Sequence, residues 1–203
     1  LVIQAFKMAA EPFFFSISAD KNSKETYARV MRWFVILLTL MFLNVTLYID
    51  IWKHFVGSEY HQALGIVPIL MLSYIFLGVY YNLTVWYKLT DKTQYGTYIM
   101  VIGAVVTITF NWAFIPVLGY YACAWGTLLC YAALMALSYY WGQKYYPVPY
   151  ELPQLFKYLG LMLALFGVYY IISGFSTNIV LHFVLSTIFF AAYLYYVFIQ
   201  YKS

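Results

Sequence analysis

A charged pair stands in a strongly apolar stretch near the beginning of the sequence, AFKMAAEPFFF at residues 5–15. Lys7 and Glu11 are four residues apart, so a helix would place both side chains on one face, where they can pair. If the stretch lies in a membrane, such groups usually face a bundle interior or a watery cavity. Pro12 follows at once, and because proline has no N–H, we expect a kink or a helix end there.

Two interpretations of this pair stand side by side. In the first, Lys7 helps to line a cavity for an anionic ligand, and Glu11 holds the lysine in place. In the second, the stretch is the cytoplasmic end of a helix, and both side chains extend toward water.

Single polar residues in other apolar stretches are weaker candidates. Asn44, Asn82 and Asn111 have apolar surroundings, and hydrogen bonds between helices explain such residues more often than ligands do. Most tyrosines are explained by packing or by the belt of aromatic residues at the membrane–water boundary. Tyr74 is an exception in position, because it stands near the middle of an apolar run. The residues that we predict to bind substrate are Lys7, Glu11, Tyr74, Asn82 and Asn111.

Sequence motifs of enzymes and metal sites are scarce. The three histidines, His54, His61 and His182, lack metal-ligand spacing, and no HExxH, GxSxG or P-loop pattern occurs. Cys123 and Cys130 would lie roughly 10 Å apart on one helix, which is too far for a disulfide. We therefore expect no catalytic residue, no metal and no cofactor. His54 and His61 are interpreted as boundary residues, and His182 as a packed or cavity-facing one.

The composition indicates whether these residues lie in water or in a membrane. Hydrophobic residues make up 65% of the 203 residues and charged residues 9%, whereas soluble domains contain about 25% charged residues. So few charges could not cover a surface in water. Transmembrane strands are short and alternate in polarity, which these long runs do not. The sequence therefore predicts an all-α, polytopic transmembrane helical bundle.

Uncharged runs predict six complete spans and a partial helix at 1–15, because about 20 residues cross the hydrocarbon layer. Pro116 and Gly119 in FIPVLGYY divide one long run, and SGFSTN at 173–178 divides another. We expect three antiparallel hairpins with short outer connections, and a first inner loop long enough for a surface-lying amphipathic turn. The six predicted spans are 33–49, 62–87, 95–115, 120–142, 155–172 and 178–200.

Basic residues alternate with these spans. Nine of the eleven Lys and Arg fall on one side of the predicted bundle, and the opposite connections hold only Lys53. The positive-inside rule places the nine in the cytoplasm, together with the loops at 16–32, 88–94 and 143–157 and the C-terminus. The nine are Lys21, Lys24, Arg29, Arg32, Lys88, Lys92, Lys144, Lys157 and Lys202.

Several stretches together resemble the second half of bacterial polysaccharide flippases, members of the multidrug/oligosaccharidyl-lipid/polysaccharide exporter superfamily. The lipopolysaccharide O-antigen and capsule flippases are the most similar. The resemblance covers nearly the whole chain, but the last two predicted spans carry no residues specific to this family. Its most specific blocks are A-F-K-x-A-x-E-P-F and Y-Y-N-L-T-V-W-Y-K-L-T-D-K-T. The other stretches are YIDIWKHFVGSEY, FNWAFIPVLGYYACAWGTLLCY and WGQKYYPVPYEL.

The resemblance implies a fold of about fourteen helices in two bundles around a central cavity. Residues 1–203 would supply the end of the eighth helix and the six that follow, so we expect a longer protein whose N-terminal bundle is missing here. The first residue, Leu1, agrees with that expectation. Lys7 and Glu11-Pro12 match the family pattern, which has a basic residue at the lysine.

The implied activity is transfer of an undecaprenyl-diphosphate-linked oligosaccharide from the cytoplasmic to the periplasmic leaflet of the bacterial inner membrane, for lipopolysaccharide or capsule biosynthesis. The expected partners are this lipid-linked substrate, membrane lipid, a coupling ion and the N-terminal half of the same chain. Nucleic acid is not expected, because no basic run of the kind that grips it is present.

Three alternatives remain open. A cation-coupled drug or metabolite antiporter of the same superfamily should carry acidic residues deep in its spans, and only Glu11 and Asp50 come close. A membrane enzyme of the polysaccharide pathway typically needs a large outer loop, and the outer loops predicted here are short. A structural scaffold without transport is the third.

Overall fold

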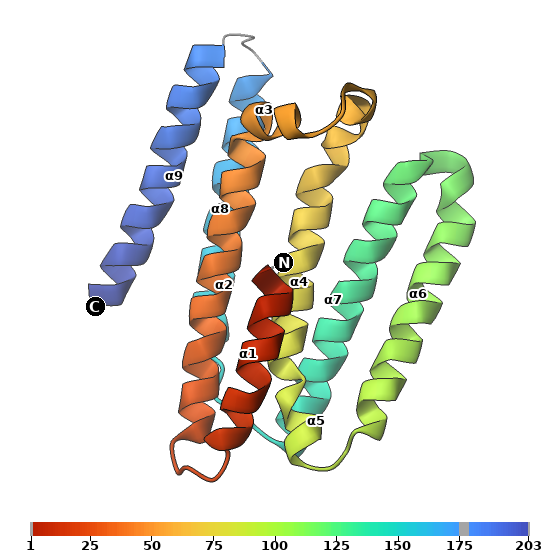
Figure 1. Ribbon diagram of the computed structural model, residues 1–203, viewed down its shortest axis with the longest axis vertical. Helices are drawn as coiled ribbons and strands as arrows, with labels where there is room; N and C mark the ends of the chain where they lie inside the picture. Colours follow the sequence, from red (N-terminus) through yellow and green to blue (C-terminus); the bar gives the residue numbers. More distant parts are fainter. Residues whose placement is uncertain (1, 175–178, 203) are drawn as a thin grey trace. The chain divides into compact units, whose positions relative to one another are not determined.

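The computed structural model describes residues 2–174 and 179–202, which form helices and their connections without a strand (Figure 1). Within these described residues, six helical stretches are long and apolar enough to cross a membrane. The chain is therefore a multi-pass membrane protein, and the predicted all-α bundle is confirmed. The six stretches are Ser23–Leu47, Ser58–Leu89, Gln94–Leu118, Tyr120–Tyr145, Leu152–Ser173 and Val180–Gln200.

The chain divides into two compact units. Unit 1 comprises Leu1–Phe34 and Ile69–Glu151, and unit 2 comprises Val35–Pro68 and Leu152–Ser203. The helices in chain order are α1 (Val2–Ser16), α2 (Ser23–Leu47), α3 (Ile49–Trp52), the 3₁₀ helices η1 (Lys53–Phe55) and η2 (Ser58–Ile66), α4 (Val67–Leu83), α5 (Val85–Leu89), α6 (Gln94–Leu118), α7 (Tyr120–Tyr145), α8 (Leu152–Ser173) and α9 (Ile179–Lys202).

Two of the three predicted hairpins pack as predicted. In unit 1, α6 lies along α7, and in unit 2, α8 lies along α9. Pro116 belongs to α6 rather than to the turn, which consists of Gly119 alone. Gly119 has a φ of 56°, a conformation that glycine adopts easily because glycine has no Cβ. Of the predicted break at 173–178, Ser173 ends α8, and residues 175–178 lie outside the described residues.

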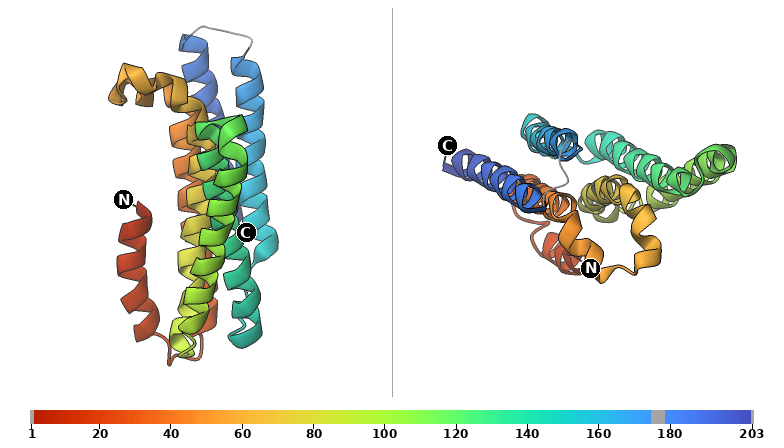
Figure 2. Two further views of the ribbon diagram at one scale, coloured as in Figure 1. Left: turned by 90° about the vertical axis from the view of Figure 1, so that its right-hand side faces the viewer. Right: turned by 90° about the horizontal axis from the view of Figure 1, so that it is seen from above.

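The two spans of the first predicted hairpin fall into different units. The later part of α2 belongs to unit 2, whereas nearly all of α4 belongs to unit 1. The connection between them is also not a short loop, because α3, η1 and η2 occupy it. Within unit 2, α3 and η1 turn away from the axis of α2 (Figure 2).

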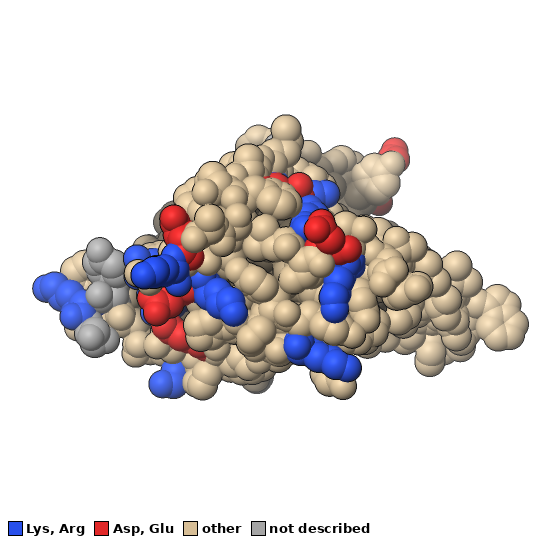
Figure 3. Space-filling model, turned by 90° about the horizontal axis from the view of Figure 1, so that it is seen from below, with Lys and Arg blue, Asp and Glu red and all other residues tan. Residues whose placement is uncertain are grey.

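One end of unit 1 carries the connections that the sequence placed on one side of the membrane. The α1–α2, α5–α6 and α7–α8 connections all lie at this end (Figure 1). Figure 3 shows Lys and Arg gathered with Asp and Glu in the view from below. The alternation of basic residues along the chain therefore agrees with the fold of this unit.

The α1–α2 connection is shorter than predicted. Residues 16–32 were expected to form a loop with a surface-lying turn, but α2 already begins at Ser23. Two charged residues of this stretch have partners: Arg32 Nη1 lies 2.8 Å from Glu151 Oε2, and Lys24 Nζ lies 4.7 Å from the centre of the Tyr146 ring. Since these groups are accommodated within unit 1, the helix continues through them.

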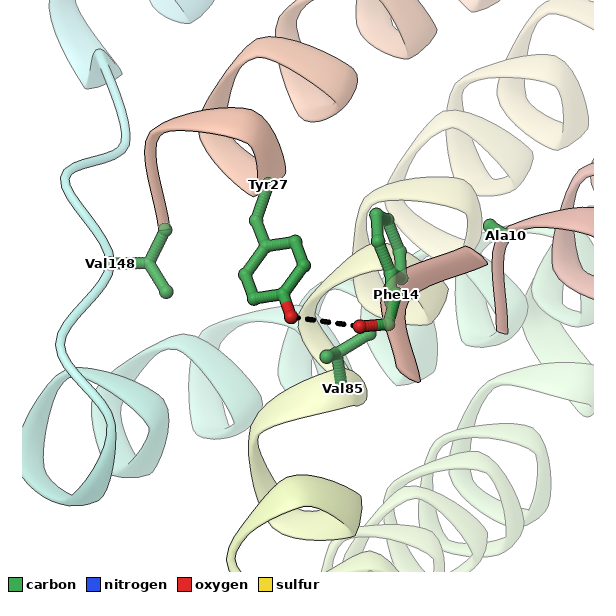
Figure 4. Packing of buried hydrophobic residues seen from close by; sticks show 5 residues of the cluster. All are labelled: Ala10, Phe14, Tyr27, Val85 and Val148. Atoms are coloured by element: carbon green, nitrogen blue, oxygen red, sulfur yellow. Dashed lines mark hydrogen bonds between the residues drawn. The ribbon is translucent and has the colours of Figure 1, made fainter. Parts of the chain in front are cut away.

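The end of α1 is fixed by a buried hydrogen bond. The helix passes through Pro12 and ends at Ser16, so the expected helix end at the proline is not observed. The hydroxyl of Tyr27 in α2 donates to the carbonyl oxygen of Phe14 at 2.9 Å, inside a cluster that includes Val85 and Val148 (Figure 4). The bond satisfies a carbonyl in the last turn of a helix, where no intrahelical donor is available.

Replacing Tyr27 by Phe is expected to lower the free energy of unfolding by about 1–2 kcal/mol, because the Phe14 carbonyl stays buried without its donor. Equilibrium unfolding in mixed micelles measures the change. The control is Tyr140→Phe, which alters an exposed tyrosine of α7 and is expected to cost less than about 0.5 kcal/mol. Equal effects of the two substitutions would contradict the role of this hydrogen bond.

Candidate functional site

The predicted charged pair lies where α1 runs beside α4 and α5 in unit 1. Glu11 Oε1 lies 2.5 Å from Nζ of Lys88, which was predicted to stand in a loop and instead belongs to α5. Lys7 Nζ lies 4.9 Å from the centre of the Tyr81 ring. Lys7, Glu11 and Lys88 are all half-buried.

The expected pairing of Lys7 with Glu11 therefore needs correction. Among the described residues, the ion pair of Glu11 is with Lys88, 77 positions away in the sequence, rather than with its neighbour one helical turn before it. Lys7 instead faces the π-electrons of a tyrosine, a contact that attracts a cation. The site thus holds two cations and one carboxylate, so its formal charge is positive.

Tyrosine rings extend the site along α4 and α7. Tyr131 packs, with Tyr81, against the buried cluster of Leu77, Tyr80, Ile99 and Leu134. The rings of Tyr74 and Tyr131 lie 6.2 Å apart between their centres, and Tyr74 is 46% exposed. Phenol rings combine an apolar face with a hydroxyl group, and the faces can pack against sugar rings.

The two predicted asparagines of unit 1 differ from their expected roles. Asn82 in α4 is buried, and both polar atoms of its side chain have no hydrogen-bond partner among the described residues. The buried Oδ1 of Asn111 in α6 also has none there, and it lies so close to Gly126 of α7 that a Cβ at that glycine would stand 2.7 Å away. The interpretation as bonds between helices is therefore wrong for these atoms.

Sequence reasoning missed Lys88, Tyr81 and Tyr131 as members of this site. One signal could have found two of them: Tyr81 and Lys88 stand seven residues apart, a spacing that returns to the same helix face. Lys7 and Glu11 share a face in the same way, and α1 packs against α5. Nothing in the local sequence indicates Tyr131, which only the packing of α7 brings near.

A second polar cluster lies in unit 2, where α3 and η1 meet α9. Lys53 Nζ donates to Asp50 Oδ1 at 2.7 Å, and His182 Nδ1 lies 3.5 Å from Asp50 Oδ2. The hydrogen bond from Lys53 holds the pKa of the Asp50 carboxyl below its ordinary value of 3.8, against the opposing effect of burial. A cavity of about 30 Å³ beside Asp50 and His182 has room for about one water molecule. His54 and His61 are exposed.

This cluster predicts a pH dependence. Because the pKa of Asp50 is lower in the folded protein than in the unfolded chain, its carboxylate stabilises the fold above the ordinary value of 3.8. That contribution is lost as the pH falls through the lowered folded value. Asp50→Asn is therefore expected to flatten the fall in stability below pH 3.8, measured by thermal unfolding across this range. An unchanged acid limb would contradict the shift. The control is Asp20→Asn, at an exposed position of unit 1.

Comparison of the chain with protein-family models, with curated proteins and with solved structures finds no match in any of the three.

Proposed function

We propose that the chain is part of a flippase that moves an undecaprenyl-diphosphate-linked oligosaccharide across the bacterial cytoplasmic membrane, for O-antigen lipopolysaccharide or capsule biosynthesis. It would supply the second helical bundle of a longer transporter, with the end of unit 1 that carries the basic connections in the cytoplasm. The protein does no covalent chemistry in this proposal. It offers a path on which the substrate keeps polar partners.

The observation that carries the proposal is the positive, half-buried group on α1 and α5. Lys7 and Lys88 with one carboxylate, Glu11, leave an excess of positive charge where α1 packs against α5, at the end of the apolar stretch Ser58–Leu89. Ionisable residues at such positions are costly and usually belong to a substrate path. A diphosphate would lose its water on entering hydrocarbon, and lysine side chains can replace that water with charge-assisted hydrogen bonds.

Glu11 and the tyrosines have separate roles in this mechanism. Glu11 holds Lys88 when no anionic headgroup is present, so the lysine is not left buried and unpaired. An arriving diphosphate competes with that carboxylate for the lysine. Tyr74, Tyr81 and Tyr131 offer ring faces and hydroxyls to the sugars. The amide of Asn82, which has no hydrogen-bond partner in the described ranges 2–174 and 179–202, adds a donor and an acceptor on α4.

The test uses the complete protein that contains this chain, reconstituted with a lipid-linked oligosaccharide. Lys7→Ala is expected to slow transfer between leaflets about tenfold, equivalent to about 1.4 kcal/mol. Lys7→Arg should retain transfer because it keeps the cation. The control is Lys21→Ala, at an exposed position of the α1–α2 connection, which should leave transfer unchanged.

Three results would overturn parts of the proposal. Normal transfer by Lys7→Ala would remove this lysine from the mechanism. A covalently altered sugar product would make the protein an enzyme of the pathway. Transport of small drugs or metabolites driven by a cation gradient, without transfer of lipid-linked sugar, would favour the antiporter.

A further inference from the structure

The connection between α2 and α4 carries a row of outward-facing apolar side chains. It begins two residues after the transmembrane helix α2 and ends where α4 begins. Phe55 is 81% exposed, and the rings of Trp52 and Phe55 lie 5.9 Å apart between their centres. The exposed large apolar residues of this connection are Ile51, Trp52, Phe55, Val56 and Tyr60.

Several polar groups of the same connection have partners within unit 2. Lys53 donates to Asp50 at 2.7 Å, and Asp50 in turn contacts His182 of α9. Nε2 of His61 lies 3.1 Å from the carbonyl oxygens of both Lys53 and Val56, so this nitrogen carries a hydrogen and donates. The loop is thereby closed on itself by polar contacts, while its rings face outward.

The location of this segment follows from its neighbours in the chain. Ser58–Leu89 is 32 residues long, whereas about 20 residues cross the hydrocarbon layer, so η2 extends beyond the span that α4 forms. Helices that cross the membrane flank the connection on both sides, and α3 and η1 turn away from the axis of α2 (Figure 2). The connection therefore returns to the membrane face at which α2 ends.

We propose that residues 51–60 bind the bilayer itself, with Trp52, Phe55 and Tyr60 inserted at the boundary between lipid headgroups and acyl chains. Aromatic rings favour this boundary, and a surface segment with apolar residues on one side lies in it. If the segment lay in water, these five apolar side chains would stay exposed to it, which is unfavourable. The contact between Asp50 and His182 links the anchor to α9, so the anchor also fixes the depth of that helix. This inference holds whatever the protein transports.

Fluorescence quenching on the full chain in phosphatidylcholine vesicles tests the proposal. Cys123 and Cys130 are first replaced by serine, and a single cysteine is introduced as Phe55→Cys or Tyr60→Cys to carry an environment-sensitive fluorophore. The matched control is Glu59→Cys, an exposed position on the same connection. The quenchers are lipids spin-labelled near the headgroup, lipids spin-labelled near the end of the acyl chain, and iodide in the water.

At position 55, the headgroup-labelled lipid is expected to quench several-fold more strongly than the chain-end-labelled lipid, and iodide several-fold less than at position 59. Equal iodide quenching at 55 and 59 would show that the segment lies in water and would overturn the proposal. Protection from iodide and from both lipids would show that a protein surface covers it, which also overturns the proposal. Circular dichroism of each labelled variant confirms that the helices are intact.

Discussion

Replacing Glu11 by lysine is expected to lower the free energy of unfolding by about 2–3 kcal/mol, because Lys88 loses its carboxylate and faces a second cation. The side chains of Lys88 and Glu11 are 25% and 34% exposed. Their interaction is therefore stronger than that of a surface pair, which is worth about 1 kcal/mol or less, and weaker than that of a fully buried one. Lys7 lies one helical turn away and adds to the repulsion.

The exchanged pair provides the decisive measurement. Lys88→Glu alone places two carboxylates in contact and should also destabilise the protein, whereas Glu11→Lys combined with Lys88→Glu restores an attractive pair. We expect the double variant to recover most of the lost free energy in equilibrium unfolding, which gives a coupling energy of about 2 kcal/mol. Effects of the two substitutions that simply add would show that the side chains do not interact.

Replacing Gly142 by alanine is expected to cost about 2 kcal/mol, because the new methyl group would overpack a tight contact. A Cβ at Gly142 of α7 would stand 2.9 Å from Cδ1 of Trp86. The indole is buried, donates from Nε1 to Ser138 Oγ at 3.3 Å, and stacks on Tyr145 with 5.8 Å between ring centres. With both sides of the ring occupied, it cannot move aside without breaking these contacts.

Gly160 is the matched control for this prediction. It also lies inside a long helix, α8, but a Cβ there would meet no atom of the described residues within 4 Å. Gly160→Ala should be neutral or stabilise the protein by up to about 1 kcal/mol, since alanine favours helices. Unfolding in mixed micelles and tryptophan fluorescence compare the two variants. If Gly142→Ala were as stable as Gly160→Ala, Trp86 would not be held as tightly as its contacts indicate.

The spans could be predicted from the sequence because the rule that sets them is local. Within lipid, every backbone N–H and C=O needs a partner, and a helix supplies these partners from its own segment. The run from Thr93 to Gln143 therefore became two helices that turn at Gly119. The same local rule misplaced the start of α2, because charged residues such as Arg32 were assigned to a loop without knowledge of partners such as Glu151.

The candidate site could be predicted only in part. Lys7 and Glu11 were identified by their charge within an apolar stretch, which is visible in any single sequence. Three features depend on how α1, α4 and α5 pack: Glu11 pairs with Lys88, Lys7 faces Tyr81, and the buried Asn82 side chain has no hydrogen-bond partner within the described part of the chain. Their spacing in the sequence was compatible with several arrangements.

For this protein, the sequence by itself determined the membrane environment, the helical class, the number of spans and the alternation of basic connections. These features depend on the apolar length and the charge of one segment at a time. The tertiary structure decided which charges meet, where α2 begins and how the connection after α2 folds. These outcomes depend on side-chain contacts between helices far apart in the chain, such as Glu11 with Lys88 and Asp50 with His182. No local pattern encodes such a contact, because it forms only when the packing of two whole helices favours it.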